Sequence, residues 1–187
     1  MIRTIEISKT PLLGLALLGL LQQKPSSGYD LVKTFSRNPI GRFSSSPGAI
    51  YPALRRLEER QLIIGRIDSG SGMRQRKTFR PTAAGRSALK MWLKRPIKRE
   101  DVVRGMEELL LRFALMDGVL TDAQTLRFLE ALDEQLRAYL AVLRDFSDSK
   151  MPLTATLALK SGVLGYTAQL DWASEAIAAY RKRCLDK

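Results

Sequence analysis

Lysine and arginine are the residues in the first half of this chain whose number and grouping point most clearly to chemistry. Residues 1–95 contain 18 Lys and Arg but only 5 Asp and Glu, whereas residues 96–187 contain 13 and 14. Cations in such excess neutralise phosphates, which favours a polyanion as the partner of the first half. The alternative is a basic surface without a specific partner.

Histidine is absent and Cys184 is the single cysteine. This composition removes His-based metal sites and Ser-His or Cys-His catalysis, and one cysteine forms no internal disulfide. The sequence also lacks a nucleophile elbow, a phosphate-binding loop and paired catalytic carboxylates. We therefore expect no enzyme, no cofactor and no metal site.

Membrane and export signals are also missing. The longest apolar stretch, Leu12–Leu21, is about half as long as the roughly 20 residues of a membrane-spanning helix. Residues 1–6 lack the charged region, apolar core and cleavage site of a signal peptide. We expect a cytoplasmic protein with no membrane partner.

The elements that must position the basic residues are four helices and a β-hairpin. Ser46 followed by Pro47 predicts a helix start, because serine favours the N-cap and proline the first helical position. Pro81 predicts that the second strand ends by Arg80. This order favours a winged helix-turn-helix with a two-stranded β wing. The first helix is predicted to have Thr10 as its N-cap and Pro11 as its first residue, and the last helix to be capped by Thr82. The predicted ranges are 11–21, 29–36, 47–60, 62–67, 74–80 and 83–93.

The second half is predicted to be entirely helical. Thr121 and Gln124 have the spacing of a capping box, and two long helices with heptad periodicity follow. The first seam is Leu129, Leu132, Leu136, Tyr139, Leu143 and Phe146, and the second is Leu159, Val163, Tyr166, Leu170, Ile177 and Tyr180. We expect an antiparallel pair that packs against a second protomer, with a closed intramolecular bundle as the alternative.

The domain boundary is expected near Pro96–Arg99. Residues 1–95 would be the winged helix-turn-helix DNA-binding domain, and residues 96–187 an all-α dimerisation domain. The fold class is therefore mainly α.

Three segments resemble the PadR-like transcriptional regulators. Gly28-Tyr29-Asp30-Leu31 resembles the opening of that family. The run from Ser44 to Glu58, with Ser-Pro-Gly-Ala-Ile-Tyr-Pro at its centre, closely resembles its recognition helix. Thr82–Arg86 with Trp92 and Leu93 matches the helix after the wing. The second half is similar to the long C-terminal domain of the subfamily that includes virulence-gene activators.

The resemblance implies a homodimer that binds double-stranded DNA at a palindromic operator. Repression, as in many relatives, is the expected outcome, with activation as the alternative, because the outcome depends on where the operator lies. Family members often release DNA when a small hydrophobic molecule binds near the dimer interface. Trp92, Trp172, Tyr166 and Met106 are the candidate wall residues of such an effector site, with ordinary core packing as the alternative.

The candidate DNA contacts follow from this layout. A recognition helix presents its N-terminal residues to base edges, and the preceding helix and the wing supply phosphate contacts. Arg55 or Arg56 could instead pair with a neighbouring glutamate, and Tyr51 could pack against the wing. The candidates are Tyr29, Lys33, Ser45, Ser46, Gly48, Ala49, Tyr51, Arg55, Arg56, Arg74, Arg76 and Lys77.

Ala49 stands where family members often carry a polar residue, so base reading is expected to rely on Tyr51, Ser45 and DNA shape. A different class of function also fits the seamed helices. The chain could be a regulator-derived protein–protein module with weak DNA affinity, although the basic first half argues against this.

Overall fold

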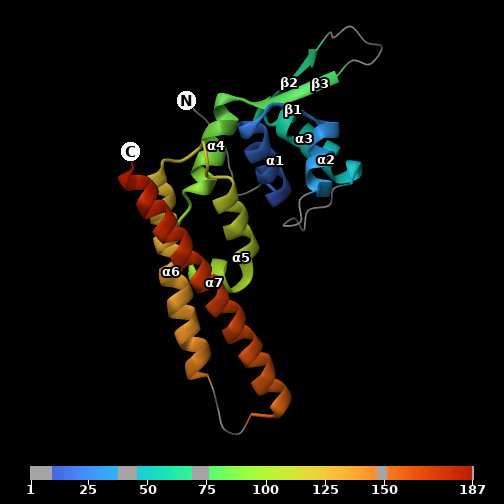
Figure 1. Cartoon of the computed structure of the whole chain (residues 1–187). Coiled ribbons are helices and arrows are strands. Elements are labelled where there is room, and N and C mark those ends of the chain that lie inside the picture. Colours follow the sequence, from blue (N-terminus) through green and yellow to red (C-terminus); the bar gives the residue numbers. More distant parts are fainter. Residues whose placement is uncertain (1–9, 38–45, 69–75, 147–150, 187) are drawn as a thin grey trace, which may run out of the picture. The chain divides into compact units, whose positions relative to one another are not determined.

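The computed structural model describes residues 10–37, 46–68, 76–146 and 151–186. Backbone contacts divide the chain into two compact units, an N-terminal unit (Met1–Leu93) and a C-terminal unit (Lys94–Lys187) (Figure 1). Nowhere in these four ranges is a helix long and apolar enough to cross a membrane.

The described part of the N-terminal unit contains four helices and a small sheet. In chain order the elements are α1 (Leu12–Gln23), β1 (Ser26–Ser27), α2 (Gly28–Arg37), α3 (Pro47–Glu59), β2 (Ile63–Asp68), β3 (Arg76–Pro81) and α4 (Ala83–Leu93). This order confirms the predicted winged helix-turn-helix.

Helix α1 is the centre of the N-terminal core. Leu17 and Leu18 are fully buried, as the dense leucine content of this helix predicts. The helix begins at Leu12 with Pro11 as its N-cap residue, one position later than the sequence suggested. The predicted N-cap, Thr10, therefore lies one residue before the cap position, and its hydroxyl accepts a hydrogen bond from the Arg60 guanidinium at 2.8 Å.

The sheet has three antiparallel strands in the order β1-β3-β2, one more than the predicted two-stranded wing. The additional strand pairs Ser26 with Phe79 and Ser27 with Thr78. Two serines carry no apolar alternation, which is why sequence periodicity read this segment as a turn. The sheet therefore connects the segment before α2 directly to the wing.

Strand β3 continues through Pro81, so the predicted end at Arg80 is wrong by one residue. Pro81 lies opposite Ile63, and the next hydrogen bond runs from the Thr82 amide to the Leu62 carbonyl at 3.0 Å. In an antiparallel pair only alternate residues exchange hydrogen bonds. Pro81 lacks a backbone N–H, but it lies at a position where no hydrogen bond to β2 would form, so the strand pair loses no hydrogen bond.

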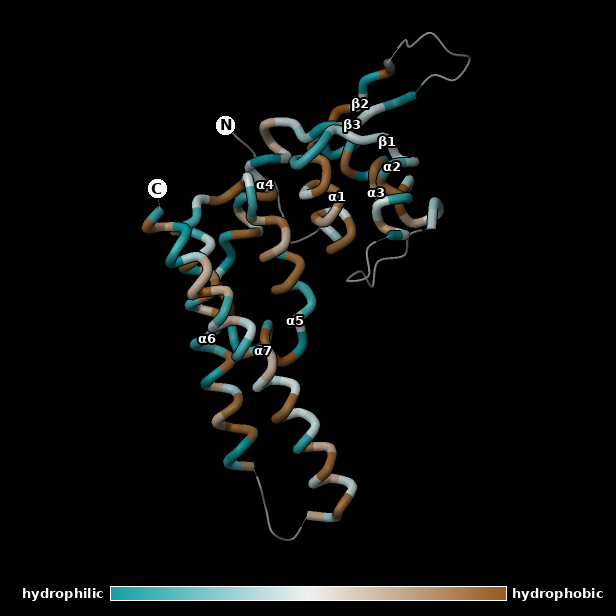
Figure 2. The backbone as a smooth tube through the Cα atoms, in the orientation of Figure 1, coloured by the Kyte–Doolittle hydropathy of each residue, from teal (hydrophilic) through white to brown (hydrophobic). Residues whose placement is uncertain are grey.

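The C-terminal unit contains α5 (Arg99–Ala114), α6 (Asp122–Asp145) and α7 (Leu153–Leu185). The predicted capping box at the start of α6 is confirmed, with Thr121 and Gln124 bonding each other's backbone amides. Helices α6 and α7 run antiparallel, as contacts from Glu130 to Arg181 and from Tyr139 to Tyr166 require. Figure 2 shows hydrophobic and hydrophilic residues alternating along α6, as in an amphipathic helix.

Arg112 on α5 is a charged residue inside the C-terminal core, with no exposed surface. Its Nη2 donates to the Arg95 carbonyl, and its guanidinium lies 5.0 Å from the centroid of the Phe128 ring. Burial lowers the pKa of this side chain to about 10. Arg112 thus links α5 to the chain before it and to α6.

Gly85 on α4 packs closely against the backbone of Leu62, the residue before β2. A Cβ atom at this position would lie 1.9 Å from the Leu62 carbonyl oxygen. We expect Gly85→Ala to lower the free energy of unfolding by about 3 kcal/mol, because a backbone atom cannot move aside cheaply. Urea denaturation of the variant measures this.

Gly48→Ala is the matched control, since the nearest atom to its Cβ would be the Ser46 hydroxyl at 4.0 Å. Equal stability of the Gly85→Ala and Gly48→Ala proteins would contradict the packing argument.

Candidate nucleic-acid interface

Helix α3 has one buried face and one exposed face. Ile50, Leu54 and Leu57 are at most 2% exposed and hold the helix in the core. The opposite face carries residues at helical spacing, namely Gly48, Tyr51, Pro52, Arg55 and Glu59. The core thus fixes which side of α3 is available to a partner.

The first turn of α3 is uncrowded. Ser46 is the N-cap residue and Pro47 the first helical residue, as predicted, although the Ser46 side chain makes no N-cap hydrogen bond. Gly48 is exposed, and Ala49 is half-buried. A small exposed residue at this point lets another molecule approach the helix backbone closely.

Two tyrosines border this turn. Tyr51 is 49% exposed, and its ring packs against Gly28 at the start of α2, where an added Cβ would lie 2.5 Å from a ring carbon. It therefore packs on α2, whereas the sequence left packing on the wing as the alternative to DNA contact. Tyr29 is 69% exposed on α2, and Lys33 on the same helix is also exposed.

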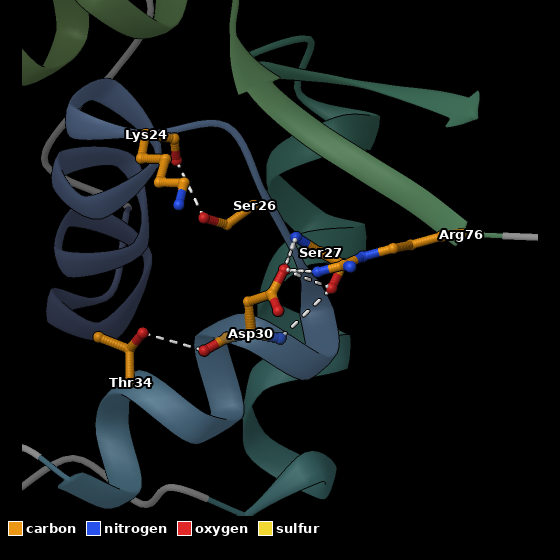
Figure 3. Close-up of polar contacts among 6 residues, drawn as sticks. All are labelled: Lys24, Ser26, Ser27, Asp30, Thr34 and Arg76. Carbon is orange, nitrogen blue, oxygen red and sulfur yellow. Dashed lines mark hydrogen bonds and ion pairs between the residues drawn. The ribbon is translucent and has the colours of Figure 1, made fainter. Parts of the chain in front are cut away.

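Asp30 closes the N-terminus of α2. Its carboxylate accepts hydrogen bonds from the Ser27 amide at 3.0 Å and the Ser27 hydroxyl at 2.8 Å, and the Ser27 hydroxyl accepts in turn from the Asp30 amide (Figure 3). This reciprocal arrangement is a capping box with aspartate at the third helical position. The hydrogen bond from the Ser27 backbone N–H is the main cause that lowers the pKa of the Asp30 carboxyl.

Two of the predicted wing contacts, Arg76 and Lys77, lie in the described part of the wing and are paired on opposite sides of β3. Arg76 reaches the Asp30 carboxylate on α2, as Figure 3 shows. Lys77 reaches Glu58 on α3, with its Nζ 2.8 Å from the carboxylate oxygen. Successive strand residues point to opposite faces, which is why neighbours contact different helices.

A third pair lies on α3 itself. The Arg55 guanidinium contacts the Glu59 carboxylate at 2.9 Å, and both side chains are mostly exposed. The alternative raised from the sequence, pairing of Arg55 with a neighbouring glutamate, is therefore what the structure has. Arg56 is exposed.

Ser45 and Arg74, two further candidates, lie outside the described residues. Sequence reasoning missed Asp30 and Glu58 as partners of the wing. The Ser27-Gly28-Tyr29-Asp30 spacing is a capping signal that could have revealed Asp30. Glu58 and Lys77 are 19 residues apart, and no local pattern connects them.

The candidate dimerisation residues have unequal positions in the C-terminal unit. Leu129, Leu132 and Leu136 are fully buried within a single chain. Most of the others are half-buried, in part between α6 and α7, while Phe146 is 68% exposed. The half-buried seam residues are Tyr139, Leu143, Leu159, Val163, Tyr166, Leu170, Ile177 and Tyr180.

A helix pair, an outward-facing second helix and a sheet hairpin beside it together define a winged helix-turn-helix, the class of fold that places a recognition helix against DNA. Residues 17–91 match the Transcriptional regulator PadR-like family. The match covers most of the N-terminal unit, so this part of the chain is similar to that family.

Two curated relatives share this region. The Transcriptional regulator YqjI of Escherichia coli (strain K12) is 40% identical over 58 residues, covering 31% of this chain and 28% of the relative. The Negative transcriptional regulator PadR of Bacillus subtilis (strain 168) is 33% identical over 79 residues, covering 42% and 43%. The matches thus span less than half the length of either relative.

Solved structures of the same family are also similar. Bacillus subtilis PadR in complex with operator DNA is 21% identical with a TM-score of 0.45, covering 91% of this chain and 99% of that one. The PadR-like regulator BC1756 of Bacillus cereus is 26% identical with a TM-score of 0.39, at the same coverage.

The lowered pKa of Asp30 gives a pH prediction. A carboxylate whose pKa is lower in the folded than in the unfolded chain adds stability above its unfolded value, near 3.8, and that stability is lost as the pH falls through the folded pKa. We expect wild type to be more stable than Asp30→Asn at neutral pH, and the difference to shrink on acidification. Thermal unfolding across a pH series measures it, and a difference that grows towards low pH would contradict the assignment.

Proposed function

We propose that this protein is a sequence-specific DNA-binding transcriptional regulator that acts as a homodimer on a palindromic operator. The observation that carries the proposal is the exposed, uncrowded face of α3 within a PadR-like N-terminal unit. The net charge of residues 1–95 supports it, because a polyanion is the natural partner of such a surface.

In this proposal the first turn of α3 lies in the major groove. Ser46, Gly48 and Ala49 let the helix backbone approach, and the Tyr51 hydroxyl bonds a base or a phosphate. Lys33 and Arg56, which are exposed, contact phosphates on either side. Phosphate contacts fix the orientation, whereas the turn at Gly48 provides sequence discrimination.

We propose repression as the outcome of binding. Its support is the similarity of residues in this chain to a relative named as a negative transcriptional regulator. A small hydrophobic molecule would release the DNA. The half-buried rings of Trp172 and Phe113, whose centroids are 5.3 Å apart, are the candidate walls of its site.

The homodimer is supported by apolar side chains that one chain leaves uncovered. Leu153, Leu157 and Leu164 are 55–73% exposed and share one face of α7. Val142 in α6 is 43% exposed, and Phe146, the C-cap residue of that helix, is 68% exposed. Exposed apolar surface of this extent is typical of an interaction site, and a second copy of the chain is the occupant we propose.

Gly48→Ala tests the DNA-facing role of α3. The added methyl group meets nothing closer than 4.0 Å within the protein, so the fold should be unchanged. We expect the affinity for the operator to fall about five- to tenfold, because the methyl group separates the helix from the bases. Affinity for a scrambled duplex should hardly change.

The measurement is a titration of operator-length duplexes, including the region upstream of the protein's own gene, across a salt series. Gly162→Ala on α7 is the control, since its Cβ would also meet nothing within 4 Å. Equal, weak binding of the wild type to every sequence would refute the proposed function.

A Leu157→Glu, Leu164→Glu double variant tests the dimer. Both side chains are exposed in one chain, so the monomer should stay folded while the dimer dissociates, with a fall in apparent mass by light scattering. Leu185→Glu, at an 86% exposed position near the end of α7, is the control and should remain dimeric. A wild-type protein that is monomeric at micromolar concentration would contradict the proposal.

A further inference from the structure

Each described carboxylate of the N-terminal unit forms an ion pair with a cation that was predicted to contact DNA. Side chains are described for three acidic residues there, Asp30, Glu58 and Glu59, and each contacts a cation that we expected to face DNA. The cations are Arg76, Lys77 and Arg55 respectively. Cations in this unit far outnumber carboxylates. All three described carboxylates nevertheless pair with cations that were predicted to contact DNA, which suggests a common role for these pairs.

Two of these pairs differ from the third because they join separate elements. Asp30 connects α2 to β3, and Glu58 connects α3 to the same strand. The Arg55–Glu59 pair lies within one turn of α3 and does not connect separate elements. Asp30 and Glu58 therefore hold the base of the wing from both of its faces.

Both carboxylates are themselves fixed in place. Asp30 is held by the Ser27 amide and hydroxyl, so it cannot follow Arg76 away from α2 (Figure 3). Glu58 accepts a hydrogen bond from the Gly65 amide at 3.3 Å while its other oxygen contacts Lys77. A carboxylate held by backbone amides is a fixed partner for a cation rather than a chance surface contact.

Gly65 makes room for the second pair. A Cβ atom at this position would lie 2.1 Å from the Lys77 Cε and 2.9 Å from a Glu58 oxygen. The lysine side chain crosses the strand where a glycine leaves space for it. Any larger residue would push the Lys77 ammonium away from Glu58.

We propose that Asp30 and Glu58 are specificity-determining residues that restrain the wing cations Arg76 and Lys77. This inference rests on the proposed function. A phosphate must displace a carboxylate to reach either cation, which weakens binding to arbitrary DNA. A duplex whose backbone fits the restrained wing loses less affinity than arbitrary DNA does. The two carboxylates therefore raise the ratio of operator affinity to non-specific affinity.

The test compares wild type with Asp30→Asn, Glu58→Gln and the double variant, titrated with a duplex from upstream of the protein's own gene and with a scrambled duplex. Each single change should tighten binding to the scrambled duplex about two- to fivefold, as expected for an exposed ion pair. The salt slope on that duplex should steepen by about 0.9 for each freed cation. The affinity ratio should fall.

Gly65→Ala repeats the test with every charge retained. It should release Lys77 and lower the affinity ratio as Glu58→Gln does, without a large loss of stability, because the displaced atoms are the end of a flexible side chain. This variant and Glu58→Gln keep the proposal testable if loss of the α2 cap unfolds Asp30→Asn.

Glu59→Gln is the matched control, since it removes the same charge one residue from Glu58 but frees a cation that bridges no elements. It should change both affinities equally and leave their ratio as in wild type. An unchanged ratio in the Asp30 and Glu58 variants, or an equal fall in Glu59→Gln, would overturn the proposal. A wild type that does not discriminate between the duplexes would instead refute the proposed function.

Discussion

Burial of Ile50, Leu54 and Leu57 against the N-terminal core is the constraint on which the rest of the interface depends. Three nearly unexposed side chains on one stripe allow α3 a single rotation about its axis. That rotation turns Gly48, Tyr51 and Arg55 outward together. The exposed face of α3, which we propose to contact DNA, is therefore set by hydrophobic packing.

The wing is positioned by a different kind of interaction. Strand β3 is held to the core through Phe79 and the short pairing with β1, and its Arg76 and Lys77 are tied to two helices by carboxylates. Ion pairs of this exposure contribute little to stability. Their consequence is geometric, because they fix where two cations lie relative to α2 and α3. The same groups that would attract phosphate thus also orient the wing.

Much of the fold could be predicted because its signals are local. Ser46-Pro47 marks the start of α3, and Thr121 with Gln124 marks the start of α6, since caps need only a few adjacent residues. Periodicity identified the buried residues of α3 and of the first half of α6, whereas the predicted seam of α7 is only half-buried. Periodicity could not say whether Leu129, Leu132 and Leu136 would be covered by the same chain or by a second one, and the structure shows them fully buried within one chain.

The charge partners were the part that sequence could not supply. Lys77 and Glu58 meet because a strand and a helix pack together, and the β1 strand exists because β3 lies beside it. Neither fact has a local pattern. The sequence shows that the wing carries several cations, but the carboxylates that pair with Arg76 and Lys77 depend on tertiary structure.

The central claim is that the exposed face of α3 reads DNA. The most direct test is the structure of the full chain bound to a duplex selected from a random-sequence pool. The account predicts the first turn of α3 in the major groove, with Gly48 and Tyr51 against the bases or the adjoining phosphates. A complex in which this face of α3 remains in solvent would contradict it.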